Sequence, residues 1–339
     1  MERIVQAGEH ANTYRQDVAY LLALISTWSY SEPETLGKVL RRPSVGGPDR
    51  LLRLEQHSVR NPALPVDVNC YVITFDGGDQ PPLNVVCFRG TELTNIIDLL
   101  TDALVEPHPW PGGSGEEEWV HRGFFLSLDV LWPELRDVMS ELRGPLYMTG
   151  HSLGGAVSVL AARRFFDDRV FGPTLLGIYT FGQPMVGGRA FARSWPGAPL
   201  HRHVYDQDVV VRLPPLLSDS DTNTYHHFGR TWFPARRDGA PVVWSELRPE
   251  TDAETIKDIN TACEGFDILP ALLTLITTRA PSLPTEMLEF VAQLPTVNRW
   301  IGRAPLRLLR GERVIPKARF SLNDHIPTYY VDVSRNSLV

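Results

Sequence analysis

The chain has 339 residues, of which 43% are hydrophobic and 22% are charged, a balance typical of a folded globular protein. This composition argues against a fibrous, disordered or membrane-spanning chain, and the formal net charge of −7 argues against a nucleic-acid partner. Three cysteines, Cys70, Cys87 and Cys263, are too few for a disulfide framework, so we expect buried thiols.

The N-terminal region lacks a basic stretch, and its nearest apolar run, 18–25, is short and has no small-residue cleavage site. These features indicate a cytoplasmic protein, with secretion after removal of a leader as the alternative. Apolar side chains in 18–25 recur at helical spacing. With Asn12 as the N-cap, they predict a helix through about Trp28 that covers a sheet.

Apolar runs bounded by glycine, proline and aspartate predict the strands that follow. Strands are predicted over 69–75, 84–89, 145–148, 175–181 and 200–205, and helices over 156–166 and 189–195. This alternation predicts an α/β fold with a mostly parallel sheet covered on both faces. In such a sheet the chemistry gathers at the carboxyl ends of the strands.

The segment Gly150–Gly155, GHSLGG, lies where one predicted strand passes into a predicted helix. This is the layout of a nucleophile elbow, in which small residues allow a sharp turn and Ser152 Oγ stands exposed above the sheet. The first helical turn, beginning with the Leu153 amide, then offers unpaired N–H groups to a developing oxyanion. The rival interpretation, a glycine-rich turn with an idle serine, explains neither the strand nor the helix.

A serine hydroxyl needs a general base, and the base needs a carboxylate to hold its tautomer. In hydrolases with this elbow, the acid and then the histidine follow the serine along the chain. Asp206 and Asp208 follow the strand 200–205, and His226, His227 and His325 lie further downstream. Spacing leaves the acid open, because residues two apart along a strand point to the same side.

At this point several separated segments resemble the motifs of class 3, fungal-type lipases, a family of the α/β-hydrolase superfamily. They are Val86–Thr91, Val120–Phe124, Thr149–Gly155, Thr180–Gly187, Asp208–Pro214, and Asn323–His325 together with Tyr329. The resemblance covers about residues 68–235 and 318–332, and it departs from the family at Val211, where proline is common.

The resemblance implies one α/β-hydrolase domain over 1–339, with Ser152 as nucleophile, Asp208 as orienting acid and His325 as base. It adds Thr91 to Leu153 as the second donor of the oxyanion hole. It further implies a carboxylic-ester hydrolase, a lipase that cleaves acylglycerols or similar apolar esters through an acyl-enzyme and needs no cofactor or metal. The alternatives are a phospholipase A1 or feruloyl-type esterase with the same machinery, and a non-catalytic scaffold that binds lipid or protein.

Other histidines are expected to be structural. His226 and His227 fit a packed strand, His151 points away from the reaction, and His121 supports the elbow by a hydrogen bond. The apolar stretch 93–100 fits either a mobile lid over the acyl pocket or an ordinary core helix.

Residues 246–317 contain short apolar stretches broken by proline, none long enough to cross a bilayer. They predict a largely helical insertion that serves as a cap or an interaction element. Four arginines recur in it near helical spacing, namely Arg299, Arg303, Arg307 and Arg310. They indicate a solvated face or, alternatively, transient contact with a lipid surface.

Overall fold

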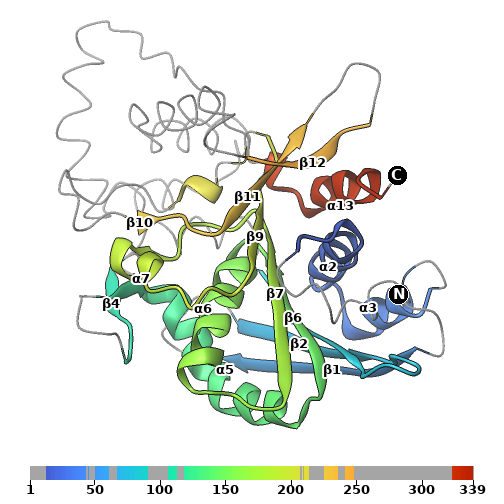
Figure 1. Cartoon of the computed structure of the whole chain (residues 1–339), viewed down its shortest axis with the longest axis horizontal. Coiled ribbons are helices and arrows are strands. Elements are labelled where there is room, and N and C mark those ends of the chain that lie inside the picture. Colours follow the sequence, from blue (N-terminus) through green and yellow to red (C-terminus); the bar gives the residue numbers. More distant parts are fainter. Residues whose placement is uncertain are drawn as a thin grey trace, which may run out of the picture. The chain divides into compact units, whose positions relative to one another are not determined.

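A large sheet runs through the part of the chain that the computed structural model describes, which is residues 13–42, 45, 50–60, 67–90, 106–112, 118–206, 208, 210–213, 225–235, 241–247 and 323–338 (Figure 1). This eight-stranded sheet has the order β1-β2-β3-β6-β7-β9-β11-β12. Its strands are β1 (Leu51–Arg60), β2 (Asp67–Phe75), β3 (Leu83–Phe88), β6 (Gly144–His151), β7 (Pro173–Phe181), β9 (Leu200–His203), β11 (Arg230–Ala235) and β12 (Val243–Glu246). Strands β3, β6, β7, β9 and β11 are parallel, and antiparallel strands flank them.

Helices cover both faces of this sheet, as Figure 1 shows. On one face lie α2 (Gln16–Trp28), α3 (Pro33–Leu40) and α13 (Pro327–Asn336), and on the other lie α5 (Arg122–Glu141) and α6 (Leu153–Asp167). A short helix, α7 (Arg189–Arg193), adjoins a smaller sheet of β4 (Pro107–Pro109), β5 (Trp119–His121), β8 (Gly187–Gly188) and β10 (Tyr225–His226). The prediction of a mostly parallel α/β sheet with two covered faces is confirmed.

Alternation along the strands builds the core between the sheet and α2. Tyr71, Ile73 and Phe75 of β2 are fully buried in one cluster with Leu22 and Ile25 of α2. Every second residue of a strand points to the same face, so these three side chains face α2 together. Burying each large apolar side chain contributes about 1.5–3 kcal/mol, which explains why this helix packs on the sheet.

The predicted elements match the observed ones with shifts at their ends. Each predicted strand and both predicted sheet helices are present, and α6 begins at Leu153, closer to the serine than the predicted start at 156. The first helix ends at Trp28 as predicted, but the expected Asn12 cap is wrong. Arg15, with extended backbone, precedes the first helical residue, Gln16, and Asn12 lies outside the described residues.

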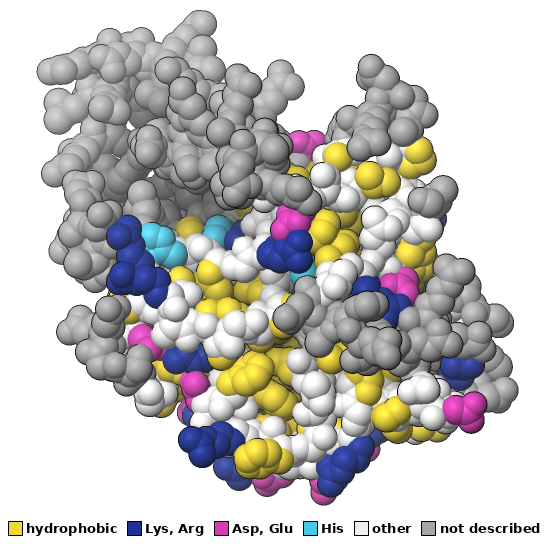
Figure 2. Space-filling view, in the orientation of Figure 1, with side chains coloured by type: hydrophobic (Ala, Val, Ile, Leu, Met, Phe, Trp, Pro, Cys, Tyr) yellow, Lys and Arg dark blue, Asp and Glu magenta, His cyan; other side chains and the backbone are white. Residues whose placement is uncertain are grey.

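Contacts divide the chain into two units, Met1–Leu247 with Ser321–Val339, and Arg248–Phe320. The first unit holds both sheets, whereas the second lies outside the described residues and with it nearly all of the predicted insertion. Among the described helices none has the length and apolar character needed to cross a membrane. On the face shown in Figure 2, acidic and basic side chains of the described residues are interspersed rather than gathered by sign.

Two of the three cysteines fall in the described part of the sheet. Cys70 and Cys87 are buried free thiols, as expected, and Cys263 lies outside the described residues. Burial raises the pKa of Cys87 to about 12, so this thiol stays protonated and packs as a small apolar group.

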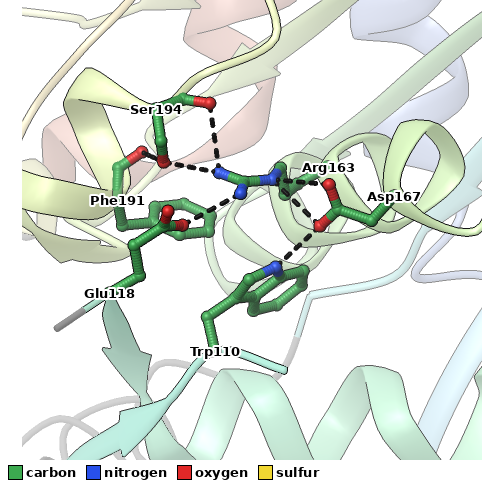
Figure 3. Close-up of polar contacts among 6 residues, drawn as sticks. All are labelled: Trp110, Glu118, Arg163, Asp167, Phe191 and Ser194. Atoms are coloured by element: carbon green, nitrogen blue, oxygen red, sulfur yellow. Dashed lines mark hydrogen bonds and ion pairs between the residues drawn. The ribbon is translucent and has the colours of Figure 1, made fainter. Parts of the chain in front are cut away.

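A buried arginine fastens α6 to its neighbours (Figure 3). Arg163 donates to Glu118 (2.9 Å) and to both oxygens of Asp167 (3.0 Å each). It also donates to the Ser194 hydroxyl (2.8 Å), and Trp110 Nε1 donates to Asp167 (2.7 Å). These bonds join α6 to the segments beside β5, α7 and β4, and so fix the helix that starts immediately after Ser152.

Replacing Glu118 by alanine is expected to destabilise the protein by about 3 kcal/mol, because the Arg163 charge would stay buried without this partner. The side chains of Arg163 and Glu118 are only 7% and 1% exposed. Urea unfolding would measure the change. Asp129→Ala is the matched control, since its ion pair with Arg164 is more exposed (48% and 18%) and is worth at most about 1 kcal/mol. Equal losses in the two variants would contradict the assignment.

Candidate active site

The elbow forms where β6 passes into α6. Ser152 adopts φ 59° and ψ −128°, and its amide donates to the Phe181 carbonyl at 2.8 Å. A Cβ at Gly154 would lie 2.1 Å from the Phe88 carbonyl oxygen, and one at Gly150 would lie 2.3 Å from the Gly154 backbone. Both positions therefore require glycine, and the predicted strand–serine–helix turn is confirmed. Ser152 itself is 0% exposed, so the expectation that its hydroxyl stands exposed above the sheet is wrong.

His325 and Asp208 meet although 117 residues separate them. His325 ends a short 3-10 helix (Asn323–His325), and Asp208 lies in the loop after β9. His325 Nδ1 lies 2.8 Å from Asp208 Oδ2, and the two side chains are 1% and 0% exposed. Because a carboxylate only accepts, the proton sits on Nδ1, which leaves Nε2 of the neutral ring with a free lone pair.

Two further donors hold the Asp208 carboxylate. The Val210 amide donates to Oδ1 at 2.9 Å, and the Tyr330 hydroxyl donates to Oδ2 at 2.5 Å. Burial, together with the Asp208 charge, raises the pKa of Tyr330 well above its usual value, so the phenol remains a donor. The carboxylate is thus fixed in one orientation toward His325.

The end of β7 brings the serine and the histidine to one place. The amide of Ser152 is bonded to Phe181, and the next residue, Gly182, lies against the other two side chains. A Cβ at Gly182 would lie 2.8 Å from His325 Cε1 and 3.0 Å from Asp208 Oδ2. Ser152 Oγ and His325 Nε2 are both buried and have no hydrogen-bond partner among the described residues. Buried polar groups are normally hydrogen-bonded, so a hydroxyl and an imidazole nitrogen without partners are available to react with an incoming substrate.

The structure distinguishes between the two acids that sequence spacing left open. His325 bonds to Asp208, whereas Asp206 is half-buried with φ 40°. Residues two apart point to the same side only within a strand, but β9 ends at His203 and the two acids lie in the loop beyond it. A loop does not alternate its side chains, so the two carboxylates need not face the same way.

A tyrosine that the resemblance did not name, Tyr330, contacts the Asp208 carboxylate. Tyr329, named from the resemblance, is 36% exposed and stacks on Tyr205 with ring centroids 5.1 Å apart, and its neighbour Tyr330 reaches Asp208. A helical signal in the sequence could have found Tyr330. Val333, Ser334 and Ser337 follow it at helical spacing, and all four are buried.

The other histidines take structural positions. The hydrogen bond of His121 caps α5 and does not support the elbow as expected: Nδ1 accepts from the Phe124 amide at 3.4 Å, and burial lowers the pKa of His121 to about 3. His226 belongs to β10, and His227 donates to the Val211 carbonyl at 2.5 Å. His151 is closer to the site than expected, because its Nε2 lies 2.9 Å from the His325 carbonyl oxygen.

Two predicted parts of the site lie outside the described residues, namely Thr91 and the apolar stretch 93–100. The Leu153 amide is the first of α6, so it has no acceptor within the helix. Within the described residues, no group of three or more His, Cys, Asp or Glu could hold a metal ion.

Comparisons with known proteins agree with this geometry. The family model for lipase (class 3) matches residues 85–218. The lipase of Rhizomucor miehei is 35% identical over 146 residues, covering 41% of this chain and 39% of that protein. Triacylglycerol lipase OBL1 of Arabidopsis thaliana is 34% identical over 161 residues, covering 45% of this chain and 28% of that protein. The chain therefore spans less than half the length of either relative.

The fold also matches a solved structure. The triacylglyceride lipase of Rhizomucor miehei superposes with a TM-score of 0.54 and 25% identity, covering 72% of this chain and 91% of that one. With the elbow and the His325–Asp208 pair, these matches show that the chain is similar to class 3 lipases and has the α/β-hydrolase fold.

Proposed function

We propose that the chain is a serine carboxylic-ester hydrolase that cleaves acylglycerols through an acyl-enzyme. The observation that carries the proposal is the His325–Asp208 bond of 2.8 Å beside a buried Ser152 whose hydroxyl has no partner among the described residues. An imidazole oriented through Nδ1 presents Nε2 as a base, and a serine at an elbow is the group that such a base activates.

In the proposed reaction, Ser152 Oγ attacks the ester carbonyl while His325 Nε2 takes its proton. The tetrahedral intermediate then expels the alcohol, which leaves with the proton from Nε2, and the acyl group remains on Oγ. Water attacks this acyl-enzyme in the same way, with Nε2 first taking and then returning a proton, and the carboxylic acid is released. Asp208 stays ionised and stabilises the imidazolium in both halves.

The oxyanion would be held by backbone amides. Leu153 offers one at the start of α6, and the family motif assigns the second to Thr91. Each such donor is worth about 3 kcal/mol of transition-state stabilisation. Two glycines support this arrangement, because Gly154 lets the start of α6 lie directly against the end of β3, and Gly150 lets the end of β6 lie against the start of α6.

An apolar substrate is favoured by the surroundings of His325. Ile326 directly follows it and Tyr329 lies four residues after it, and they are 37% and 36% exposed, so apolar surface lies close to the histidine along the chain. Two of the similar proteins carry triacylglycerol or triacylglyceride lipase in their names. Contact with a lipid surface through 93–100 or the arginines of 299–310 remains a proposal, because those segments lie outside the described residues.

A fluorophosphonate probe and three esters test the function. We expect the probe to label the purified protein at Ser152 alone, and trioctanoylglycerol to be hydrolysed faster than a phosphatidylcholine or methyl ferulate, with acid release followed by titration. Faster release from phosphatidylcholine would favour a phospholipase A1, and faster release from methyl ferulate a feruloyl-type esterase. Absence of both labelling and hydrolysis would contradict the enzyme and favour a binding scaffold.

A further inference from the structure

A second series of buried hydrogen bonds reaches His325, at its main-chain carbonyl and not at its ring. The Tyr30 hydroxyl lies 2.9 Å from His151 Nδ1, and His151 Nε2 lies 2.9 Å from the main-chain carbonyl oxygen of His325. The two imidazole rings lie 4.5 Å apart between centroids, and His151 is 3% exposed. Nothing in the proposed reaction uses Tyr30 or His151, although His151 adjoins Ser152 in the chain and contacts His325.

The direction of these bonds follows from the groups themselves. A carbonyl oxygen only accepts, so His151 carries its proton on Nε2 and donates it to His325. In the neutral ring Nδ1 is then an acceptor, and it receives the Tyr30 hydroxyl. Burial, with a smaller effect of nearby His325, lowers the pKa of His151 well below its usual value, and burial raises that of Tyr30. Both groups therefore keep these protonation states across the neutral range.

The chain of bonds joins three segments that are distant in sequence. Tyr30 follows α2, His151 ends β6 beside the nucleophile, and His325 ends the short 3-10 helix before α13. The Asp208 bond sets the ring of His325, whereas the His151 bond holds its main chain. The two bonds together fix where Nε2 points, and a misplacement of about 1 Å at a reacting atom can lower a rate about 10²-fold.

Tyr30 also abuts the end of β3. A Cβ at Gly90 would lie 2.0 Å from the Tyr30 hydroxyl oxygen and 2.6 Å from the His151 carbonyl oxygen, so only glycine fits there. The Arg89 guanidinium lies 5.9 Å from the centre of the Tyr30 ring. Tyr30 is therefore packed between the end of β3 and the elbow. This packing fixes the position of the hydroxyl that bonds to His151.

We propose that Tyr30 and His151 are positioning residues, which hold the main chain of His325 so that its imidazole stays aligned with Ser152. This inference rests on the proposed hydrolase function and adds two residues to it. It predicts that breaking either bond slows turnover without weakening substrate binding, because neither residue is needed to contact the ester.

Three variants and one control test this role with p-nitrophenyl butyrate. Tyr30→Phe is expected to lower kcat about tenfold and His151→Leu about 10²-fold, with KM changed less than about twofold in both. His151→Gln should recover most of the loss, because its amide can donate to the His325 carbonyl and accept from Tyr30. Tyr71→Phe is the control: it removes another buried tyrosine hydroxyl, which bonds to the Ser31 carbonyl at 3.5 Å. Wild-type kcat in Tyr30→Phe and His151→Leu would overturn the proposal.

A measurement without turnover separates this proposal from the hydrolase function. In ¹⁵N-histidine NMR spectra of the full chain we expect His151 as a neutral Nε2–H ring from pH 5 to 9, and the Nδ1–H signal of His325 broadened by exchange in His151→Leu. A His151 ring that titrates near its ordinary pKa, or an unchanged His325 signal, would overturn the positioning role whether or not esters are cleaved. An inactive wild-type protein with the expected spectra would count against the hydrolase function alone.

Discussion

Ser152→Ala is expected to lower kcat for ester hydrolysis about 10⁶-fold, to the level set by binding and the oxyanion donors. The hydroxyl oxygen forms the covalent bond to the acyl group, and no other side chain at the elbow can replace it. The fold should survive, since Ser152 Oγ has no partner among the described residues and alanine tolerates φ 59° no worse than serine. Hydrolysis of p-nitrophenyl butyrate and the thermal unfolding midpoint would be measured together.

Ser158→Ala is the matched control for this variant. Ser158 lies on α6, the helix that begins directly after Ser152, and both serines are 0% exposed. The Ser158 hydroxyl donates to the Gly155 carbonyl at 2.7 Å, and no hydrogen bond among the described residues joins it to His325 or Asp208. Its removal should leave kcat within about threefold of the wild-type value. If Ser152→Ala retained more than a hundredth of the wild-type activity, the nucleophile would have to be sought elsewhere.

The elbow could be predicted from the sequence because its requirements are local. A buried strand, a serine between glycines and an amphipathic helix follow one another within Gly144–Asp167. The glycines at 150 and 154 are needed because backbone atoms lie within 2.3 Å of where a Cβ would stand. No contact with a distant segment is required to recognise this arrangement. Chain order and family resemblance then supplied His325.

The parts that escaped prediction depend on contacts between distant segments. Strand β9 ends at His203, and the Val204 amide then donates to the Trp232 carbonyl of the neighbouring strand at 3.0 Å. The two acids lie beyond this point, where alternation along a strand no longer says which of them faces His325. The bond from His151 to His325 spans 174 residues. Sequence spacing cannot show such a bond, so the sequence predicts that His151 points away from the reaction, whereas it contacts the main chain of His325.

Charges that sequence patterns place on a surface can also be buried. The sequence predicts the helix that contains Arg163 from its apolar spacing but says nothing of where the arginine lies. In the structure, its guanidinium is enclosed by Glu118, Asp167 and Ser194 (Figure 3). The partner at 118 ends an acidic run, Glu116–Glu118, a pattern that is more typical of a solvent-exposed loop. Only the tertiary fold, which brings β5 and α7 to α6, shows that one of these acids is a buried partner.

Asp208→Asn is expected to lower kcat about 10⁴-fold with little change in KM, as the same exchange does in serine-protease triads. An asparagine amide can donate to Nδ1, which would favour the His325 tautomer with its proton on Nε2 and remove the base. The Val210 amide can still donate to Oδ1, and the NH2 group that replaces Oδ2 can donate to His325 Nδ1 and to the Tyr330 oxygen, so the substituted amide should occupy the same position. The pH profile of kcat/KM and the NMR tautomer of His325 would report the change.

Asp206→Asn is the matched control, because it makes the same substitution two residues earlier in the same loop. Since His325 bonds to Asp208 at 2.8 Å, the Asp206 variant should keep kcat within about threefold of the wild-type value. A large loss in Asp206→Asn together with a small one in Asp208→Asn would mean that the loop rearranges when substrate binds, and that the carboxylate at 206 orients the base. Equal, large losses would mean that the loop acts as a unit rather than through one acid.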